Sequence, residues 1–118
     1  MAIQMDEMEF EGLLLLSSIF LRTGKYDRAA QVLEGLEEAR PQDAQVQKAL
    51  AFTHIRLKHF QQALPRVERY LRMPELSTEE RLWGTFLKIH VFYGLNRKDE
   101  WTRAIDEFVE LRHAALGA

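Results

Sequence analysis

The chain has 118 residues, of which 47% are hydrophobic and 29% charged, and its 16 basic and 18 acidic residues give a net charge of −2. These values are typical of one soluble globular domain, and the mixed charges leave no basic stripe that would make nucleic acid the main ligand. The absence of cysteine excludes disulfides, thiolate metal sites and thiol nucleophiles, and fits a reducing compartment.

The first predicted helix pair follows an irregular lead over residues 1–8. We expect one helix over about residues 9–22 and a second over about 26–39. Gly24 separates them as a residue that readily takes a left-handed conformation, and Pro41 stops the second helix. The apolar run at 13–21 follows acidic residues and is too short to span a bilayer. It therefore predicts neither a signal peptide nor membrane insertion, and we expect a cytoplasmic protein.

The second predicted pair begins at Asp43, which has the side chain of an N-cap for a helix over about residues 44–57. Lys58 stands where a turn glycine is expected. The next helix starts near Phe60 and is ended by Pro74. Because Pro65 lacks a backbone N–H, we expect a kink or a delayed first turn in this helix.

The third predicted pair follows an insertion at residues 73–76. Ser77 and Glu80 have the spacing of a capping box and open a long helix over about residues 78–95. Gly94 and Asn96 mark its end, and a last helix runs over about residues 99–115. The register of the long helix stays ambiguous by several residues.

An alanine that follows an aromatic residue by three positions recurs in each predicted pair. The alanines are Ala29, Ala63 and Ala104, and the first two are 34 residues apart, which is the period of a tetratricopeptide repeat. The last two are 41 apart because of the insertion. A small residue is needed at this position because a larger one would push the paired helices apart where they cross.

The sequence therefore predicts an all-α fold of three helix–turn–helix, tetratricopeptide-like repeats in a short right-handed superhelix. One domain would span residues 1–118, with repeats over about residues 9–42, 43–76 and 77–116.

No arrangement of residues predicts an enzyme, a cofactor or a metal site. The histidines form no ligand spacing, and we expect each to lie in a turn or on the surface; they are His54, His59, His90 and His113. The paired acids are adjacent in predicted helices, so their side chains point apart and cannot flank one substrate bond. No glycine-rich phosphate loop or nucleophile elbow is present.

A partner-binding groove is predicted on the concave face, which the first helix of each repeat lines. Most of the side chains there are apolar, with three cations beside them, which suits an apolar anchor or amphipathic helix of a partner. The candidate residues are Leu14, Leu21, Arg22, Lys48, Phe52, Ile55, Arg56, Phe86, Ile89 and Tyr93.

A second interface is predicted on the first helix. On a helical wheel the residues that face the second helix are Leu13, Leu16, Ser17 and Phe20. Leu15 and Ile19 point to the opposite side, where a terminal repeat normally carries polar residues. Bare aliphatic groups there indicate an interface, unless residues 1–8 cover them.

The pattern resembles that of the small tetratricopeptide-type chaperones of bacterial type III secretion systems, and within them the YscY-type chaperones. The residues that carry the resemblance extend over most of the chain. They are Glu9-Phe10, the leucines at 13–16, Gly24, Arg28-Ala29, Leu33, Leu36, Pro41, the region of Trp83, Ala104, Phe108 and Glu110-Leu111.

The resemblance implies a non-enzymatic, cytoplasmic bacterial protein that holds a small exported YscX-type partner in a hetero-complex rather than persisting as a stable monomer. Needle-subunit chaperones of the same systems are an alternative. A general adaptor or self-associating repeat module without a role in secretion is another.

Overall fold

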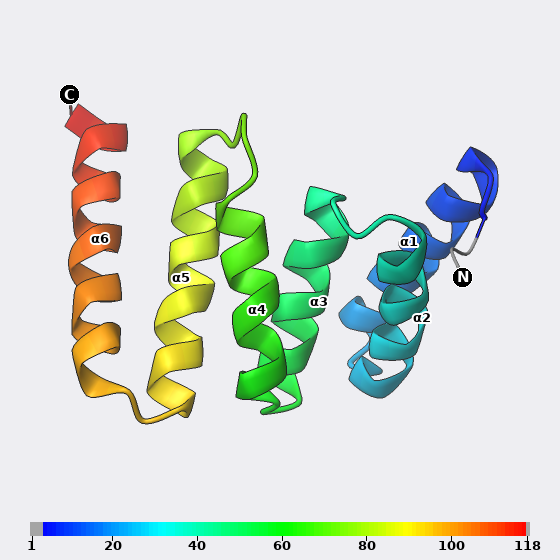
Figure 1. Cartoon of the computed structure of the whole chain (residues 1–118), viewed down its shortest axis with the longest axis horizontal. Coiled ribbons are helices and arrows are strands. Elements are labelled where there is room, and N and C mark those ends of the chain that lie inside the picture. The colour runs from blue at the N-terminus through cyan, green and yellow to red at the C-terminus, as the bar shows by residue number, and fades with distance from the viewer. Residues whose placement is uncertain (1–3, 118) are drawn as a thin grey trace.

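The protein, described here over residues 4–117 by a computed structural model, consists of six α-helices in a row (Figure 1). No strand occurs in this range, which confirms the predicted all-α class. The helices are α1 (Glu7–Arg22), α2 (Tyr26–Ala39), α3 (Ala44–Arg56), α4 (Phe60–Leu71), α5 (Thr78–Gly94) and α6 (Lys98–Gly117). Packing is most extensive within α1–α2, α3–α4 and α5–α6, and neighbouring pairs meet through α2–α3 and α4–α5.

Local capping explains where three of the helices begin. Asp43 accepts a hydrogen bond from the Val46 backbone N–H at 3.1 Å, as predicted for an N-cap. Ser77 and Glu80 form the predicted capping box, with bonds of 2.9 and 3.1 Å. The first helix starts two residues before the predicted position because Asp6 caps it and accepts from the Glu9 N–H at 2.8 Å.

The turns inside the three pairs share one backbone conformation. Gly24, Lys58 and Asn96 have φ angles of 75°, 62° and 59°, so each lies in the left-handed region. In each turn the following N–H bonds back to the last helical turn, for example His59 N to His54 O at 2.7 Å. Lys58 therefore adopts the conformation for which glycine was expected, at a steric cost that glycine does not have.

Pro65 lies inside α4, which runs without a break from Phe60 to Leu71. The expected delay of its first turn is therefore wrong. The helix tolerates Pro65 in its second turn because the carbonyl that loses its donor belongs to Gln61, which is exposed, as is Pro65, so water can bond to it. The helix ends at Leu71, before Pro74 is reached.

The three repeated alanines are all buried, as the helix-crossing interpretation predicts. Ala29 belongs to a first core cluster built from α1, α2 and α3, together with Phe10, Leu33, Leu36, Val46 and Leu50. Ala63 belongs to a second cluster built from α3, α4 and α5, together with Ala51, Val67, Leu87 and Val91. Ala104 is buried where α6 crosses α5.

Two glycines of α5 permit close packing rather than turning the chain. A Cβ on Gly84 would lie 2.6 Å from Leu71 Cδ2, and one on Gly94 would lie 2.5 Å from the Phe60 ring. Gly94 was expected to help end the helix. It is the last helical residue, as that prediction implies, and in the turn that follows Asn96 takes the left-handed conformation.

Candidate functional site

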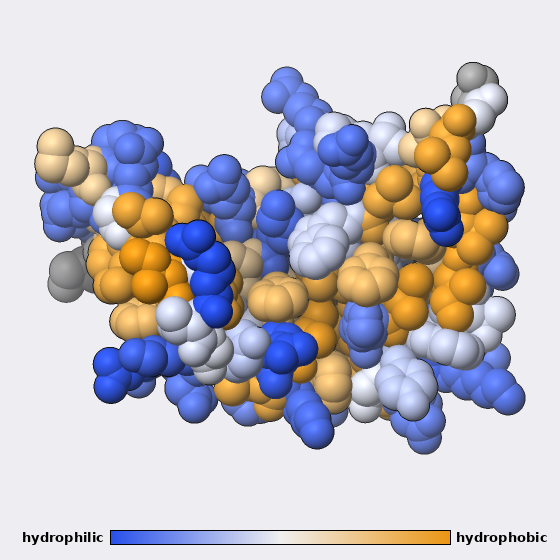
Figure 2. All heavy atoms as spheres, turned by 180° about the vertical axis from the view of Figure 1, so that it is seen from behind, coloured by the Kyte–Doolittle hydropathy of each residue, from blue (hydrophilic) through white to orange (hydrophobic). Residues whose placement is uncertain are grey.

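A groove of about 500 Å³ lies between α3 and α5. Helix α3 contributes Phe52, Ile55 and Arg56, and the following turn and α4 contribute Lys58 and Phe60. The wall on α5 consists of Trp83, Phe86, Leu87, His90 and Tyr93. Figure 2 shows the face of the molecule opposite to that of Figure 1, where hydrophobic and pale residues form an interrupted band across the middle.

Aromatic rings line this groove in continuous contact. The Phe52 ring lies 6.4 Å from that of Trp83, which stacks on Phe86 at 5.7 Å. Phe86 meets His90 edge-on at 4.7 Å and Phe108 of α6 at 6.2 Å. Trp83 and Phe86 each remain 39% exposed although they touch other rings. Such a cluster presents a large, rigid apolar surface that costs little side-chain entropy when a partner covers it.

The polar side chains of the groove carry no acid. None of its ten lining residues is Asp or Glu, whereas Arg56 and Lys58 bring fixed positive charges. The Arg56 guanidinium lies 5.1 Å above the Tyr26 ring, a cation–π contact that restrains it beside the groove. The groove therefore combines an apolar floor with a cationic edge.

Half of the predicted partner-binding residues come together here. Phe52, Ile55, Arg56, Phe86 and Tyr93 all line the groove.

The other predicted residues lie outside the groove. Leu14 and Leu21 are half-buried and pack against the first core cluster. Arg22 is exposed on α1, and Ile89 is half-buried on α5. Lys48 is half-buried on α3, and its charge adds to the hydrogen bonds of Ser77 in lowering the pKa of Glu80.

Sequence reasoning missed Trp83 and His90 as groove residues. Their signal was present, because Trp83, Phe86, His90 and Tyr93 follow one another at helical spacing along one face of α5. Because the register of that helix was uncertain, this spacing was not used to select Trp83 and His90. Lys58 and Phe60 reach the groove from the turn and from α4, and no pattern within α3 or α5 could have indicated them.

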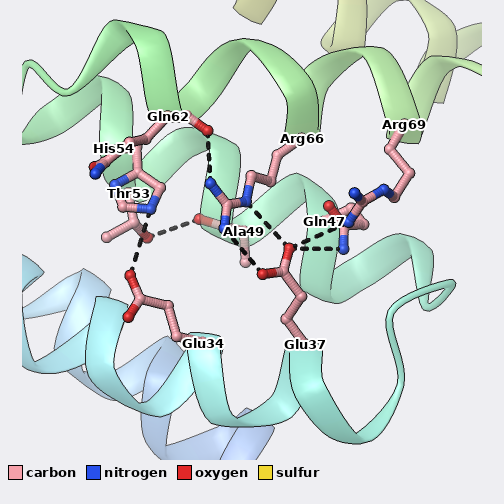
Figure 3. A network of polar contacts seen from close by, with 9 residues as sticks. All are labelled: Glu34, Glu37, Gln47, Ala49, Thr53, His54, Gln62, Arg66 and Arg69. Carbon is pink, nitrogen blue, oxygen red and sulfur yellow. Dashed lines mark hydrogen bonds and ion pairs between the residues drawn. The ribbon is translucent and has the colours of Figure 1, made fainter.

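A polar cluster ties the first helix pair to the second (Figure 3). Glu37 of α2 accepts two hydrogen bonds from Arg66 of α4, at 2.9 and 3.1 Å, and one from Gln47 of α3 at 3.0 Å. Arg69 adds a longer contact of 3.4 Å. Burial raises the pKa of Glu37, but these bonds and charges outweigh it and leave the pKa below its ordinary value of 4.5. The cluster joins the two helix pairs, although Gln47 Oε1 is buried without a hydrogen-bond partner.

His54 is buried, so the expectation that each histidine lies in a turn or on the surface is wrong for this one. Its two ring nitrogens have no hydrogen-bond partner, and Nε2 lies 3.7 Å from a Glu34 carboxylate oxygen. Burial, followed by the charges of Arg66 and His59, lowers its pKa from 6.5. Its position is 34 residues after Phe20, so the repeat period itself could have indicated an interior side chain.

Residues 4–117 contain no group of three or more His, Asp or Glu side chains that could hold a metal ion. Over the same range, no helix has the length and hydropathy that crossing a membrane requires.

Residues 20–73 match the family model described as a tetratricopeptide repeat. The match supports a tetratricopeptide-repeat protein, a class that mediates protein–protein interaction. It covers α2, α3 and α4 and starts near the end of α1. No curated protein and no solved structure shows significant similarity to the chain.

Proposed function

We propose that this protein is a dedicated chaperone that holds an apolar or amphipathic helix of one protein partner in the groove between α3 and α5. The observation that carries the proposal is the row of half-exposed aromatic rings along that groove. Exposed apolar surface of this kind marks an interaction site on a soluble protein.

The cationic edge narrows the chemistry of the partner. Arg56 and Lys58 favour a segment whose apolar anchors are flanked by Asp or Glu, because no acid of the groove would repel it. An apolar anchor lying over the Phe52 and Trp83 rings would contact aromatic carbon of both α3 and α5. This is the binding mode of a helix in a groove.

The resemblance to YscY-type chaperones suggests the biological setting. In this setting the protein binds a small exported YscX-type component, and the two form a complex in the bacterial cytoplasm before export. No cofactor enters this function. The aromatic groove would equally serve a needle-subunit chaperone, whose cargo is a small helical protein.

The experiment is co-expression of the chain with a YscX-type protein or with a needle subunit encoded in the same genome. We expect the YscX-type protein to co-purify in a stable hetero-complex. If the needle subunit co-purifies and the YscX-type protein does not, the protein is a needle-subunit chaperone. If neither is retained, a general adaptor becomes the better description.

Groove variants test the site independently of the cargo's name. Phe52 and Ile55 also pack against the second core cluster, so Trp83 and Phe86 are the cleaner positions. Trp83→Glu or Phe86→Glu should reduce affinity about thirtyfold or more, the usual effect of losing an interface hot spot. The matched control is Val109→Glu on α6, which is 46% exposed and outside the groove. If all three variants bind alike, the groove is not the site.

A further inference from the structure

Helix α1 carries a second apolar face that nothing in residues 4–117 covers. Met8, Leu15, Leu16 and Ile19 are 83%, 60%, 37% and 43% exposed. At about 100° per residue they form, with Gly12, one stripe about 100° wide along the helix. Leu16 was expected to face α2, but it lies at the edge of this stripe. Phe10 and Ser17, which are buried, lie on the opposite side of the helix.

We propose that this stripe is the interface of a homodimer in which two α1 helices pack antiparallel about a twofold axis. The occupant is inferred from the order of residues along the stripe. With the axis between Leu15 and Leu16, positions at equal distances from it on the two helices face each other. Gly12 of one copy then lies opposite Ile19 of the other, at both ends of the contact.

The steric fit at this pair is favourable. A Cβ added to Gly12 would meet nothing within 4 Å, so the glycine leaves a shallow notch in the exposed stripe. Ile19, near the centre of the same stripe, is the side chain that the antiparallel register brings to the notch. A small residue opposite a bulky one lets two helices approach closely.

The charges at the edge of the stripe are complementary in the same register. Glu11 and Arg22 lie on one edge, about 40° and 20° beyond Leu15. A twofold axis keeps this edge on the same side of both helices, so Arg22 of one copy meets Glu11 of the other with an axial offset of about 3 Å. Within one chain the two residues are about 16 Å apart along the helix and cannot pair. Arg22 makes no ion pair within residues 4–117.

The dimer would leave the partner groove open, because the stripe faces away from α2 and the groove lies between α3 and α5. Self-association and partner binding therefore rest on different surfaces and can be separated experimentally.

The test is sedimentation velocity of the full chain over a range of concentrations, with circular dichroism to verify folding. We expect a concentration-dependent dimer. Ile19→Asp should raise its dissociation constant about thirtyfold or more while helical content is retained. Glu11→Arg alone should weaken the dimer about threefold to fivefold by opposing Arg22, and the swap Glu11→Arg with Arg22→Glu should restore it.

A cysteine cross-link defines the register without relying on a weakened variant. The chain has no cysteine, so Leu15→Cys introduces one thiol close to the twofold axis. We expect it to form an intermolecular disulfide on mild oxidation, whereas Glu68→Cys on the exposed side of α4 should not. A chain that sediments as a monomer at high concentration overturns the proposal. So does a dimer that survives Ile19→Asp, or a charge swap that fails to restore association.

Discussion

The two junctions between neighbouring helix pairs are built differently. At the first junction, where α2 meets α3 and α4, Glu37 gathers donors from both later helices into a polar cluster. At the second junction, where α3 and α4 meet α5, Gly84 allows the helices to approach closely, and the contacts are mostly apolar, with one hydrogen bond from Tyr70 Oη to the Glu80 carbonyl oxygen at 3.3 Å. The first junction combines the apolar core shared by α2 and α3 with directional hydrogen bonds to Glu37. The second is closed by packing and leaves its aromatic edge open as the groove.

This difference indicates that the first junction fixes the orientation of the helix pairs, whereas the second provides a surface for binding. Hydrogen bonds to a mostly buried carboxylate fix the orientation of one pair against the next, since their geometry is restrictive. Apolar packing is non-directional and can extend onto an added surface. A partner helix would extend the second junction and leave the first unchanged.

The largest effect is expected from closing the space at the second junction. Gly84→Leu would force a side chain into the position of Leu71 and the Tyr70 ring, and overpacking of this kind costs about 1–3 kcal/mol or more. Urea unfolding followed by circular dichroism measures the loss. Gly35→Leu on α2 is the control, because its Cβ would meet nothing within 4 Å. Equal losses in both variants would contradict the close packing of α4 and α5.

The first junction should weaken when its central acid is removed. Glu37→Ala removes the acceptor of Arg66 Nε and Nη2 and one of the two acceptors of Gln47 Nε2, and loss of one partner of a largely buried bond costs about 1–3 kcal/mol. Because the folded state lowers the pKa of Glu37, its stabilising contribution is present above pH 4.5 and is lost as the pH falls below that value.

The matched control for this change is Glu38→Ala, the exposed neighbour on the same helix. It should change the free energy of unfolding by no more than about 0.5 kcal/mol. Neither variant should alter partner binding. A loss of binding in Glu37→Ala, without unfolding, would show that the two junctions are coupled.

A stabilising change is expected at the turn that borders the groove. Lys58→Gly removes the steric cost of a left-handed lysine and should raise stability by about 1 kcal/mol. Thermal unfolding measures the gain. Binding of an acidic partner should weaken in the same variant, because a positive charge leaves the groove. A variant that is destabilised would contradict the conformation of this turn.

The smallest effect concerns pH near the first junction. The pKa of His54 is lower in the folded protein than its ordinary 6.5, so the unfolded chain binds the proton more readily. Stability should therefore fall as the pH drops below 6.5, and His54→Phe should reduce this dependence. Unfolding curves at about pH 7 and about pH 5.5 make the comparison, above the range in which Glu37 titrates. An unchanged pH dependence in the variant would assign it to other groups.

The groove shows how far the repeat pattern could predict a site. Phe52 and Ile55 were predicted to face a groove from their positions relative to Ala63 in the same regular pair, and both line the groove between α3 and α5. On α5 the repeat pattern was less informative, because the insertion before this helix leaves its alignment with the first two repeats undetermined. Trp83 was therefore not selected, although it joins the rings of the two helices.

The sequence by itself determined the helices, their caps and their crossings. Asp43, Ser77 and the repeated alanines act within one helix pair, where partners lie a few residues apart or one helix away, so local chemistry suffices. Only the tertiary structure decided which surfaces remain open. The groove, the bonds of Glu37 and the burial of His54 depend on how one pair rests on the next. That arrangement depends on contacts between residues far apart in the sequence, such as Glu37 and Arg69, which are 32 positions apart, and no pattern within one helix encodes it.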